Sequence, residues 1–422
     1  MTSVRQKNNE LFAIALALYT ALLGNAAILF SLVYIFLALV QNFSIPNRAH
    51  FKTTSGQLGA VFIAYYGYFF AVSAVQSSNL EQGFVGTAPL LPFLFWGLVA
   101  LFTPYRSHAA YLPRLAFHAV VGILIIFTVA TLLHILDPYL YRPWRRVLRP
   151  TGYLVRLEMF AGNPLPFGTI LLTMSLFLFI GWEARKRMFK IFAVATFILA
   201  AWIIGFWAQT RGSFLVLIVL LPLIAWKIQL GSFASRHGFK NRVAAVAAGA
   251  GIIVLVGFLV FQFSTRLDQR LAALFTGAAQ DSSIMTRLDM FSAGLRAFFD
   301  HWLIGSGFVD LFSNSKPYLE SQTRNWTHFH NGFINHAVAG GIFGLALFIA
   351  VISYPVFALS NPQFRQDRDV VFLCVSISAI AILSALSNVL LMNHILSFFF
   401  ATLIFLTSRL ATSRAISERA SL

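Results

Sequence analysis

Apolar stretches separated by short polar or basic segments make up most of this chain. Runs of about 18 apolar residues or more recur along its 422 residues, and each is long enough to cross a hydrocarbon core about 30 Å thick. The first run, Leu11–Val40, is interrupted at Gly24-Asn25, which predicts a short helical hairpin. It is far longer than the apolar core of a signal peptide, and no small-residue cleavage site lies near it. The pattern predicts an all-α polytopic membrane protein with about 12 transmembrane helices.

Polar segments divide the chain into three regions. Residues 1–263 hold the N-terminal transmembrane helices, residues 264–331 form one long polar loop with short helices, and residues 332–422 hold the C-terminal transmembrane helices. Further spans are predicted at Leu58–Gln76, Ala88–Phe102, Leu115–Leu136, Pro164–Trp182, Met188–Ala208, Ser213–Trp226, Ala244–Phe263, Gly332–Ala358, Val370–Asn388 and His394–Leu410.

The composition argues against a soluble protein and against a nucleic-acid-binding one. Hydrophobic residues make up 58% of the chain, charged residues make up 11%, and the mean hydropathy is +0.76. The net charge of +17 is divided among short loops, a pattern typical of topology determinants and of contacts with anionic membrane lipids. The single cysteine, Cys374, lies inside an apolar run, so neither a disulfide framework nor a thiolate metal site is expected.

The lysines and arginines also predict the orientation of the bundle. Most of them lie in every second segment between the predicted spans, which puts them on the same side of the membrane as the N-terminus. Because basic residues favour the cytoplasmic side, we expect both termini in the cytoplasm. Segments Asp137–Asn163, Thr210–Gly212 and Ser264–Asn331 then face away from the cytoplasm, where neither ATP nor nucleotide sugars are available.

The scarce polar groups are concentrated where the long loop meets an apolar run. Titratable groups at such a boundary are candidate functional residues, and here they are Arg324, His328, His330 and His336. No metal site is expected, because no carboxylate stands at zinc-ligand spacing and the His-Glu-x-x-His pattern is absent. His330 and His336 are about 240° apart around a helix and cannot share a face. For each histidine taken alone, a structural hydrogen bond is as good an interpretation as catalysis.

Two arginines stand at positions that favour anion binding but also admit simpler interpretations. Arg211 lies in a tight turn between apolar runs, where it either snorkels to the interface or grips a phosphate through two parallel hydrogen bonds. Arg287 lies in Met285–Phe299, whose helical periodicity predicts an amphipathic helix on the outer membrane surface, where an arginine is ordinarily solvated. One face of that helix collects its apolar residues, namely Leu288, Phe291, Leu295, Phe298 and Phe299.

The loop Tyr141–Arg149 carries unusually dense positive charge for a segment outside the cytoplasm. Its arginines, interleaved with Trp144, suit a phosphate-rich membrane surface, although bias rather than absolute charge sets topology. They are Arg142, Arg145, Arg146 and Arg149.

Three segments resemble those of the bacterial O-antigen ligase and polymerase superfamily. They are Thr210-Arg211-Gly212-Ser213 at the start of a helix, Arg287-Leu288-Asp289-Met290 through Trp302-Leu303-Ile304-Gly305-Ser306-Gly307, and His330-Asn331 followed, after nine intervening residues, by Gly341 and then Gly344. The second segment departs from the family pattern, because Ile304 precedes the first glycine and the usual proline is missing. The resemblance covers about residues 195–350, and the loop length and lack of a large C-terminal soluble domain look more like the lipopolysaccharide ligase than the protein-glycosylating members.

The resemblance implies an inner-membrane O-antigen ligase acting on the periplasmic side. Such an enzyme transfers polysaccharide from undecaprenyl diphosphate to a sugar hydroxyl of lipid A–core by direct, inverting displacement. It implies Arg211 and Arg287 as phosphate clamps and His330 as the base, with no metal or other cofactor. We assign substrate binding to the four loop arginines and to Arg324, His328 and Asn331.

Two alternatives remain open. An O-antigen polymerase of the same superfamily differs only in the acceptor that it uses. A flippase or exporter of polyprenyl-linked glycans would need an arginine for the phosphate but no general base. The predicted spans contain no Asp or Glu, which weighs against an ion-coupled transporter.

Overall fold

The apolar runs form α-helices, as the sequence predicts. The computed structural model describes residues 2–46, 48–77, 79–103, 112–135, 148–151, 154–157, 164–204, 211–232, 282–309, 311–319, 328–360, 362–365, 367–387 and 390–419. The elements of the first part are α1 (Thr2–Leu18), α2 (Thr20–Leu23), α3 (Asn25–Asn42), α4 (Arg48–Phe51), α5 (Thr54–Ser77), α6 (Leu80–Thr87), η1 (Ala88–Leu90), α7 (Leu91–Phe102), α8 (Leu112–Ile135), β1 (Leu148–Thr151) and β2 (Leu154–Leu157). Those of the second part are α9 (Pro164–Leu176), η5 (Phe177–Phe179), η6 (Trp182–Ala184), α10 (Arg187–Trp202), α11 (Arg211–Ser232), α14 (Ser282–Asp300), η8 (Ser313–Tyr318), α15 (Gly332–Ala358), α16 (Pro362–Arg365), α17 (Arg368–Ser387) and α18 (His394–Arg419).

Five of the described helices are long and apolar enough to cross a membrane. They span Asn25–Asn42, Thr54–Ser77, Leu80–Phe102, Gly332–Ala358 and Arg368–Leu386, and shorter apolar helices pack among them. The predicted interruption at Gly24-Asn25 is confirmed, since α3 begins at Asn25 and packs against α1. The predicted span Ala244–Phe263 lies outside the described residues, so the expected total of about 12 spans stays a prediction.

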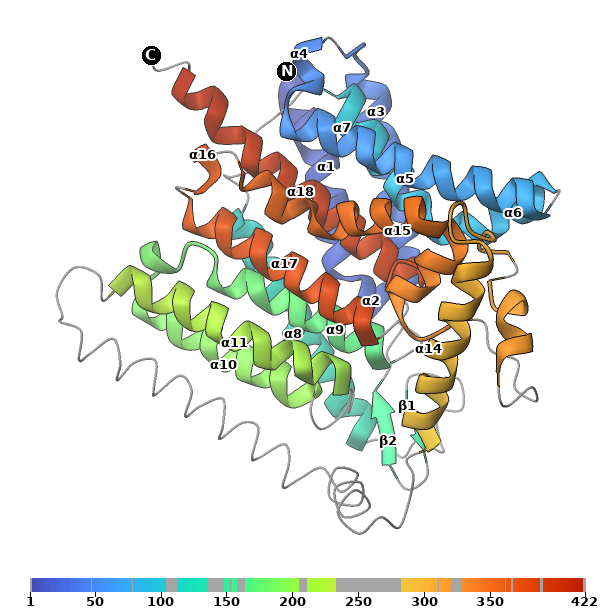
Figure 1. Ribbon diagram of the computed structural model, residues 1–422. Coiled ribbons are helices and arrows are strands. Elements are labelled where there is room, and N and C mark those ends of the chain that lie inside the picture. Colours follow the sequence, from blue (N-terminus) through green and yellow to red (C-terminus); the bar gives the residue numbers. More distant parts are fainter. Residues whose placement is uncertain are drawn as a thin grey trace.

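The core is built around α18. This helix is buried on every side from Ile395 to Leu410 and packs against α5, α7, α15 and α17. In the second half of α18, the Arg409 guanidinium donates to the Thr103 hydroxyl at 2.6 Å and lies 3.6 Å from the Glu10 carboxylate. The middle of α1, the residue after α7 and the second half of α18 therefore meet, toward the end of the bundle where Figure 1 marks both termini.

A buried ion pair sets the relative position of α11 and α17. The Lys227 ammonium lies 2.9 Å from carboxylate oxygens of both Glu183 and Asp369, and its side chain is almost fully buried. Lys227 is near the end of α11 and Asp369 near the start of α17, so the two helices run antiparallel. Arg211 lies about 24 Å before Lys227 along α11, and Leu386 lies about 25 Å after Asp369 along α17. Arg211 and Leu386 are therefore both at the other end of the bundle.

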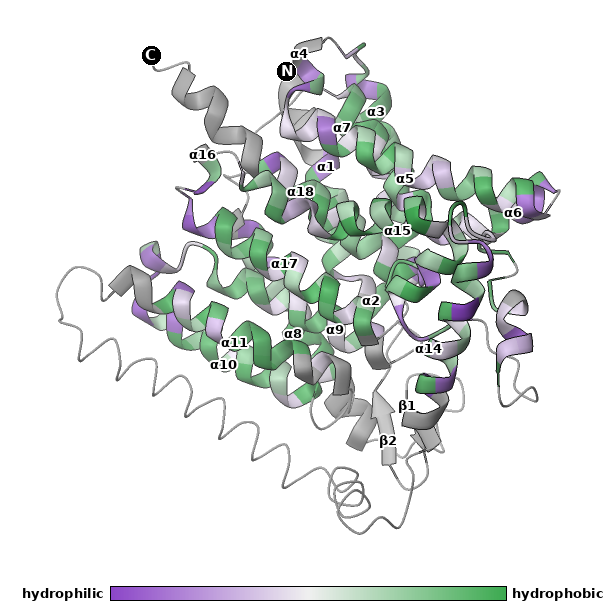
Figure 2. Cartoon of the chain, viewed as in Figure 1, coloured by the Kyte–Doolittle hydropathy of each residue, from purple (hydrophilic) through white to green (hydrophobic). Residues whose placement is uncertain are grey.

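We call that end the site face, because it carries the start of α11, the end of α17 and the start of α15. The end that carries Glu183, Lys227 and Asp369 is the opposite face. Helix α14 runs across the helix ends at the site face rather than along the bundle (Figure 1). Hydrophilic residues gather on α14 and at the helix ends, while the middle of the bundle is apolar (Figure 2).

The span predicted at Gly332–Ala358 is not one straight helix. It is broken at Gly341, whose φ of +59° and ψ of −156° are not helical. The Phe348 ring stacks on the His336 ring at 3.9 Å, although residues 12 positions apart on a straight helix are separated by about 18 Å. The short half Gly332–Gly340 therefore folds back against the long half Ile342–Ala358.

A two-stranded antiparallel sheet, which the sequence analysis did not predict, interrupts the otherwise helical architecture. Strands β1 and β2 pair with Arg149 opposite Arg156. Only two residues, Gly152 and Tyr153, separate the strands, and such a short glycine-containing connection is the signal that could have predicted this hairpin. The hairpin lies at the site face below α14 (Figure 1).

Candidate active site

Helix α14 carries Arg287 across the site face. Its buried residues Met290, Ala293 and Ala297 face the bundle, and the helix packs against α15. The apolar stripe predicted for Met285–Phe299 is present but points outward, since Leu288 is 57% and Phe299 69% exposed. An outward apolar stripe on a helix that crosses the bundle ends is typical of a helix lying in the membrane interface.

The loop before α15 holds His328 and His330 side by side. Their ring centroids are 4.3 Å apart, and both side chains are half-buried. His330 has a φ of +53°, in the left-handed region that residues other than glycine rarely adopt. Such a conformation costs free energy and tends to persist at functional sites.

Two asparagines hold this loop against the start of α15. The Asn331 side chain caps the helix by accepting from the Ile334 N–H at 3.1 Å, and its amide donates to the Leu386 carbonyl at 3.5 Å. The Asn335 side chain accepts from the Phe329 N–H at 2.9 Å. Asn331 therefore has a structural role, and its predicted substrate binding stays a prediction. Asn335 was missed because no sequence pattern distinguishes it.

Electrostatics favour a neutral imidazole at His330. Burial lowers the pKa of His330 below its ordinary value of 6.5, and the positive charge of Arg287 lowers it further. Burial and the adjacent His330 lower the pKa of His328 to about 4. Two of the residues assigned to catalysis, Arg287 and His330, thus lie close enough to interact, and His330 is able to accept a proton at neutral pH.

The segment Trp302–Gly307 completes the site by filling the break in α15. The Ser306 N–H donates to the Val338 carbonyl at 2.9 Å, and the Gly307 N–H to the Ala339 carbonyl at 2.8 Å. In return, the Trp302 carbonyl accepts from the Ile342 N–H at 2.8 Å. These bonds satisfy backbone groups that the broken helix leaves open. The second and third of the three segments that resemble the O-antigen ligase and polymerase superfamily are therefore hydrogen-bonded to each other.

Glycine is required on both sides of this contact. A Cβ atom on Gly341 would lie 2.4 Å from the Leu303 carbonyl carbon, and one on Gly305 would lie 2.4 Å from the Gly340 nitrogen. Both glycines also have positive φ angles, which other residues rarely adopt.

His336 has a structural environment away from the other histidines. Its Nδ1 donates to the Gly332 carbonyl at 2.6 Å, because a carbonyl oxygen can only accept, and its Nε2 then accepts from the Tyr65 hydroxyl at 2.7 Å. Both side chains are fully buried. This agrees with the structural hydrogen bond that the sequence analysis allowed for His336 and adds Tyr65, which the sequence analysis missed.

The remaining assigned residues are placed only in part. Arg211 is the first residue of α11 and therefore lies at the site face. Arg149 lies in β1 opposite Arg156. Arg142, Arg145, Arg146 and Arg324 lie outside the described residues. Among the described residues, no group of three His, Cys, Asp or Glu side chains could hold a metal ion.

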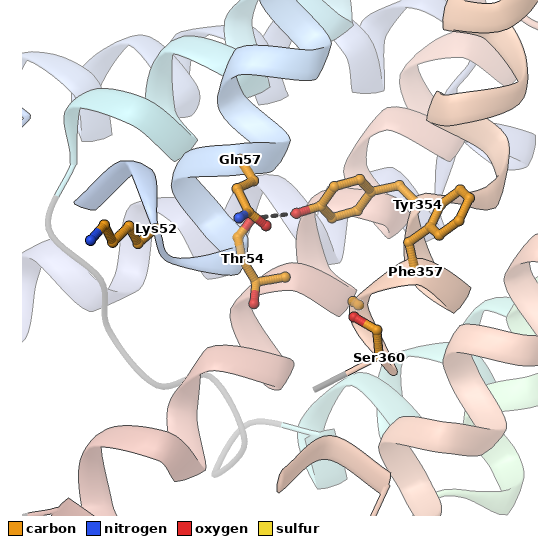
Figure 3. A pocket seen from close by; sticks show the side chains of 7 residues that line it. Lys52, Thr54, Gln57, Tyr354, Phe357 and Ser360 are labelled. Carbon is orange, nitrogen blue, oxygen red and sulfur yellow. Dashed lines mark hydrogen bonds between the residues drawn. The ribbon is translucent and has the colours of Figure 1, made fainter. Parts of the chain in front are cut away.

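The cavity in Figure 3 lies away from these groups. It has a volume of about 370 Å³ and lies between the start of α5 and the end of α15, at the opposite face. The Tyr354 hydroxyl donates to the Thr54 carbonyl there at 2.5 Å, which ties the two helix ends together. We do not assign this cavity to the active site, because it is at the other end of α15 from His330.

Comparison with known proteins agrees with this geometry. Residues 195–349 match the O-antigen ligase family model, and this stretch holds the start of α11, α14, the two adjacent histidines and the broken half of α15. No curated protein matches the chain. The matched stretch is somewhat more than a third of the chain, and it supports the resemblance of this protein to the O-antigen ligase superfamily.

Proposed function

We propose that this protein is an O-antigen ligase. It transfers O-antigen polysaccharide from undecaprenyl diphosphate to a sugar hydroxyl of lipid A–core, the final step of lipopolysaccharide assembly. The observation that carries the proposal is the pairing of a half-buried, neutral His330 with Arg287 at the face where α11 begins with Arg211. That arrangement offers a base for the acceptor beside positive charge for the diphosphate.

The chemistry requires little beyond positioning. The acceptor hydroxyl loses its proton to the His330 imidazole while its oxygen forms a bond to the anomeric carbon. The bond from that carbon to the diphosphate oxygen breaks, and the diphosphate leaves with the electron pair. Arg211 and Arg287 hold the charge that develops on the leaving group, each through two parallel hydrogen bonds. Displacement from the opposite side inverts the anomeric centre.

The membrane arrangement follows from the same proposal. The site face is periplasmic, and the opposite face, where α1 begins and α18 ends, is cytoplasmic. The outward apolar stripe of α14 then rests in the outer leaflet of the inner membrane, beside the lipid-linked substrates. The energy for transfer is stored in the donor, so no nucleotide is needed.

The arginine-rich loop is proposed to hold phosphates of lipid A–core. The register of the hairpin sets Arg149 opposite Arg156, and paired like charges across two strands are destabilising unless an anion joins them. Changing Arg142, Arg145, Arg146 and Arg149 to glutamine is expected to raise the acceptor KM more than the donor KM. High salt should mimic the change, because exposed charge contacts are screened.

A deletion strain separates the proposed ligase from the polymerase. Loss of all O-antigen from core, with lipid-linked chains of normal length accumulating, supports the ligase. A single repeat still attached to core in that strain would instead assign the polymerase activity.

Bond formation by the purified protein separates an enzyme from a flippase. The protein in lipid nanodiscs is expected to attach O-antigen from the undecaprenyl diphosphate donor to lipid A–core without ATP. Movement of the donor across a vesicle membrane with no new glycosidic bond would contradict the proposal.

A further inference from the structure

A second cavity opens at the site face, and nothing above assigns a role to it. It has a volume of about 410 Å³ and lies between the start of α6 and the segment that follows Gly307. Asn79, Glu81 and Gln82 form its polar side, and Val85, Phe308 and Val309 contribute its apolar side. A cavity of this size and mixed lining is typical of sites that bind small organic groups.

The apolar wall is fixed to the segment that fills the break in α15. The Phe308 N–H donates to the Ser73 hydroxyl at 2.9 Å, and the Phe308 ring lies edge-on to the His336 ring with 5.5 Å between centroids. Immediately before Phe308, Ser306 and Gly307 are hydrogen-bonded to the short half of α15. The cavity is therefore held in a fixed relationship to the end of that half-helix.

The charge of the cavity distinguishes it from the arginine sites. Its described lining residues include one carboxylate, Glu81, and no cation. A phosphate would be repelled there, whereas sugar hydroxyls can donate to the carboxylate and exchange hydrogen bonds with the Gln82 amide. The apolar side suits the C–H face of a sugar ring.

The surroundings indicate a ligand anchored in the membrane. Val75 is 75%, Leu80 70% and Val85 65% exposed; Val85 lines the cavity, and Val75 and Leu80 lie near it along the chain, at the end of α5 and the start of α6. Exposed apolar side chains next to a cavity with a polar side suit a molecule that has a lipid part and a sugar part.

We propose that this cavity binds an uncharged sugar unit of a membrane-anchored glycan. The identity of the glycan rests on the proposed function, which offers two sources of the same chemistry, the core of the acceptor and the O-antigen of the donor. The phosphate-bearing parts of both are held elsewhere, at the arginines.

Binding of delipidated glycans tests the proposal without any transfer reaction. The probes are core oligosaccharide and O-antigen polysaccharide, each released from its lipid, and their Kd values are measured with the full-length protein in nanodiscs. Gln82→Leu is expected to weaken binding of one probe roughly five- to tenfold, because it removes the hydrogen bonds of the amide while leaving an uncharged side chain of comparable size. Val85→Trp, which fills the cavity, should abolish that binding. The probe that responds identifies the source.

Gln57→Leu is the matched control, since Gln57 is an exposed helical glutamine that lines the cavity at the opposite face. It should leave both Kd values unchanged, and inorganic diphosphate should not compete. Unchanged binding of both probes by both Gln82→Leu and Val85→Trp would overturn the proposal.

The outcome is separable from that of the proposed function. Probe binding that depends on Gln82 in a protein that forms no glycosidic bond would retain this site and reject the ligase. Normal ligation with unaltered KM values in Gln82→Leu would retain the ligase and reject this site.

Discussion

Arg287 on α14 lies close enough to His330 for its positive charge to lower the pKa of that imidazole. The two residues are far apart in sequence and meet because α14 crosses the bundle end beside the start of α15. The arginine therefore has two effects in this account, since it offers charge to the diphosphate and keeps the base unprotonated.

These two effects can be separated by comparing Arg287→Gln with Arg287→Lys. Glutamine removes the positive charge, so the pKa of His330 should rise and the acidic limb of kcat/KM against pH should move to higher pH. Lysine keeps the positive charge but cannot form the two parallel hydrogen bonds of a guanidinium. The acidic limb should therefore stay at the same pH while the rate falls roughly 30- to 150-fold. Identical acidic limbs in the two variants would disprove the electrostatic coupling.

The break in α15 is predicted to depend on Gly341. Gly341→Ala should destabilise the protein by about 3 kcal/mol or more, because the positive φ and the nearby Leu303 backbone both exclude a side chain. Thermal unfolding in detergent measures the effect.

Gly67→Ala is the control, since a Cβ at that exposed position of α5 meets nothing within 4 Å. It should be neutral or stabilise the protein by up to about 1 kcal/mol. Equal melting temperatures for Gly341→Ala and the unaltered protein would show that the break is not required.

Tyr65 is predicted to position the short half of α15 through His336. Tyr65→Phe leaves the buried Nε2 of His336 without its hydrogen bond, which should cost about 1–3 kcal/mol of stability. The rate of transfer should fall with an unchanged pH profile, because the base itself is intact. Tyr34→Phe removes a hydroxyl from α3 and should change neither property. A normal melting temperature for Tyr65→Phe would argue against this role.

The topology is tested by two exposed serines on opposite faces. Ser313 begins η8, which packs against α14, and Ser360 lies just beyond α15; the single native cysteine, Cys374, is buried. An impermeant thiol reagent added to spheroplasts should label Ser313→Cys, and should label Ser360→Cys only after permeabilisation. The reverse pattern would place the site face in the cytoplasm and remove access to periplasmic donor.

Local patterns were sufficient to predict some elements but not how they meet. The amphipathic α14 and the interruption before α3 follow from periodicity and from Gly24-Asn25, because both depend on nearby residues alone. The fold-back at Gly341 depends on Trp302–Gly307 filling the gap, and the coupling of Arg287 to His330 depends on where α14 crosses α15. Tyr65 could not be distinguished among the aromatic residues of α5, since its role exists only through a histidine on another helix.

The central claim is that His330 is the base for glycosyl transfer, and ligation by purified His330→Ala tests it most directly. The variant and the unaltered protein are compared in nanodiscs with the undecaprenyl diphosphate-linked donor and lipid A–core, and product is quantified on a gel. We predict a 10²- to 10⁴-fold lower rate with donor binding retained. The control His301→Ala, which removes an exposed histidine just after α14, should ligate normally. A normal rate for His330→Ala would contradict the account.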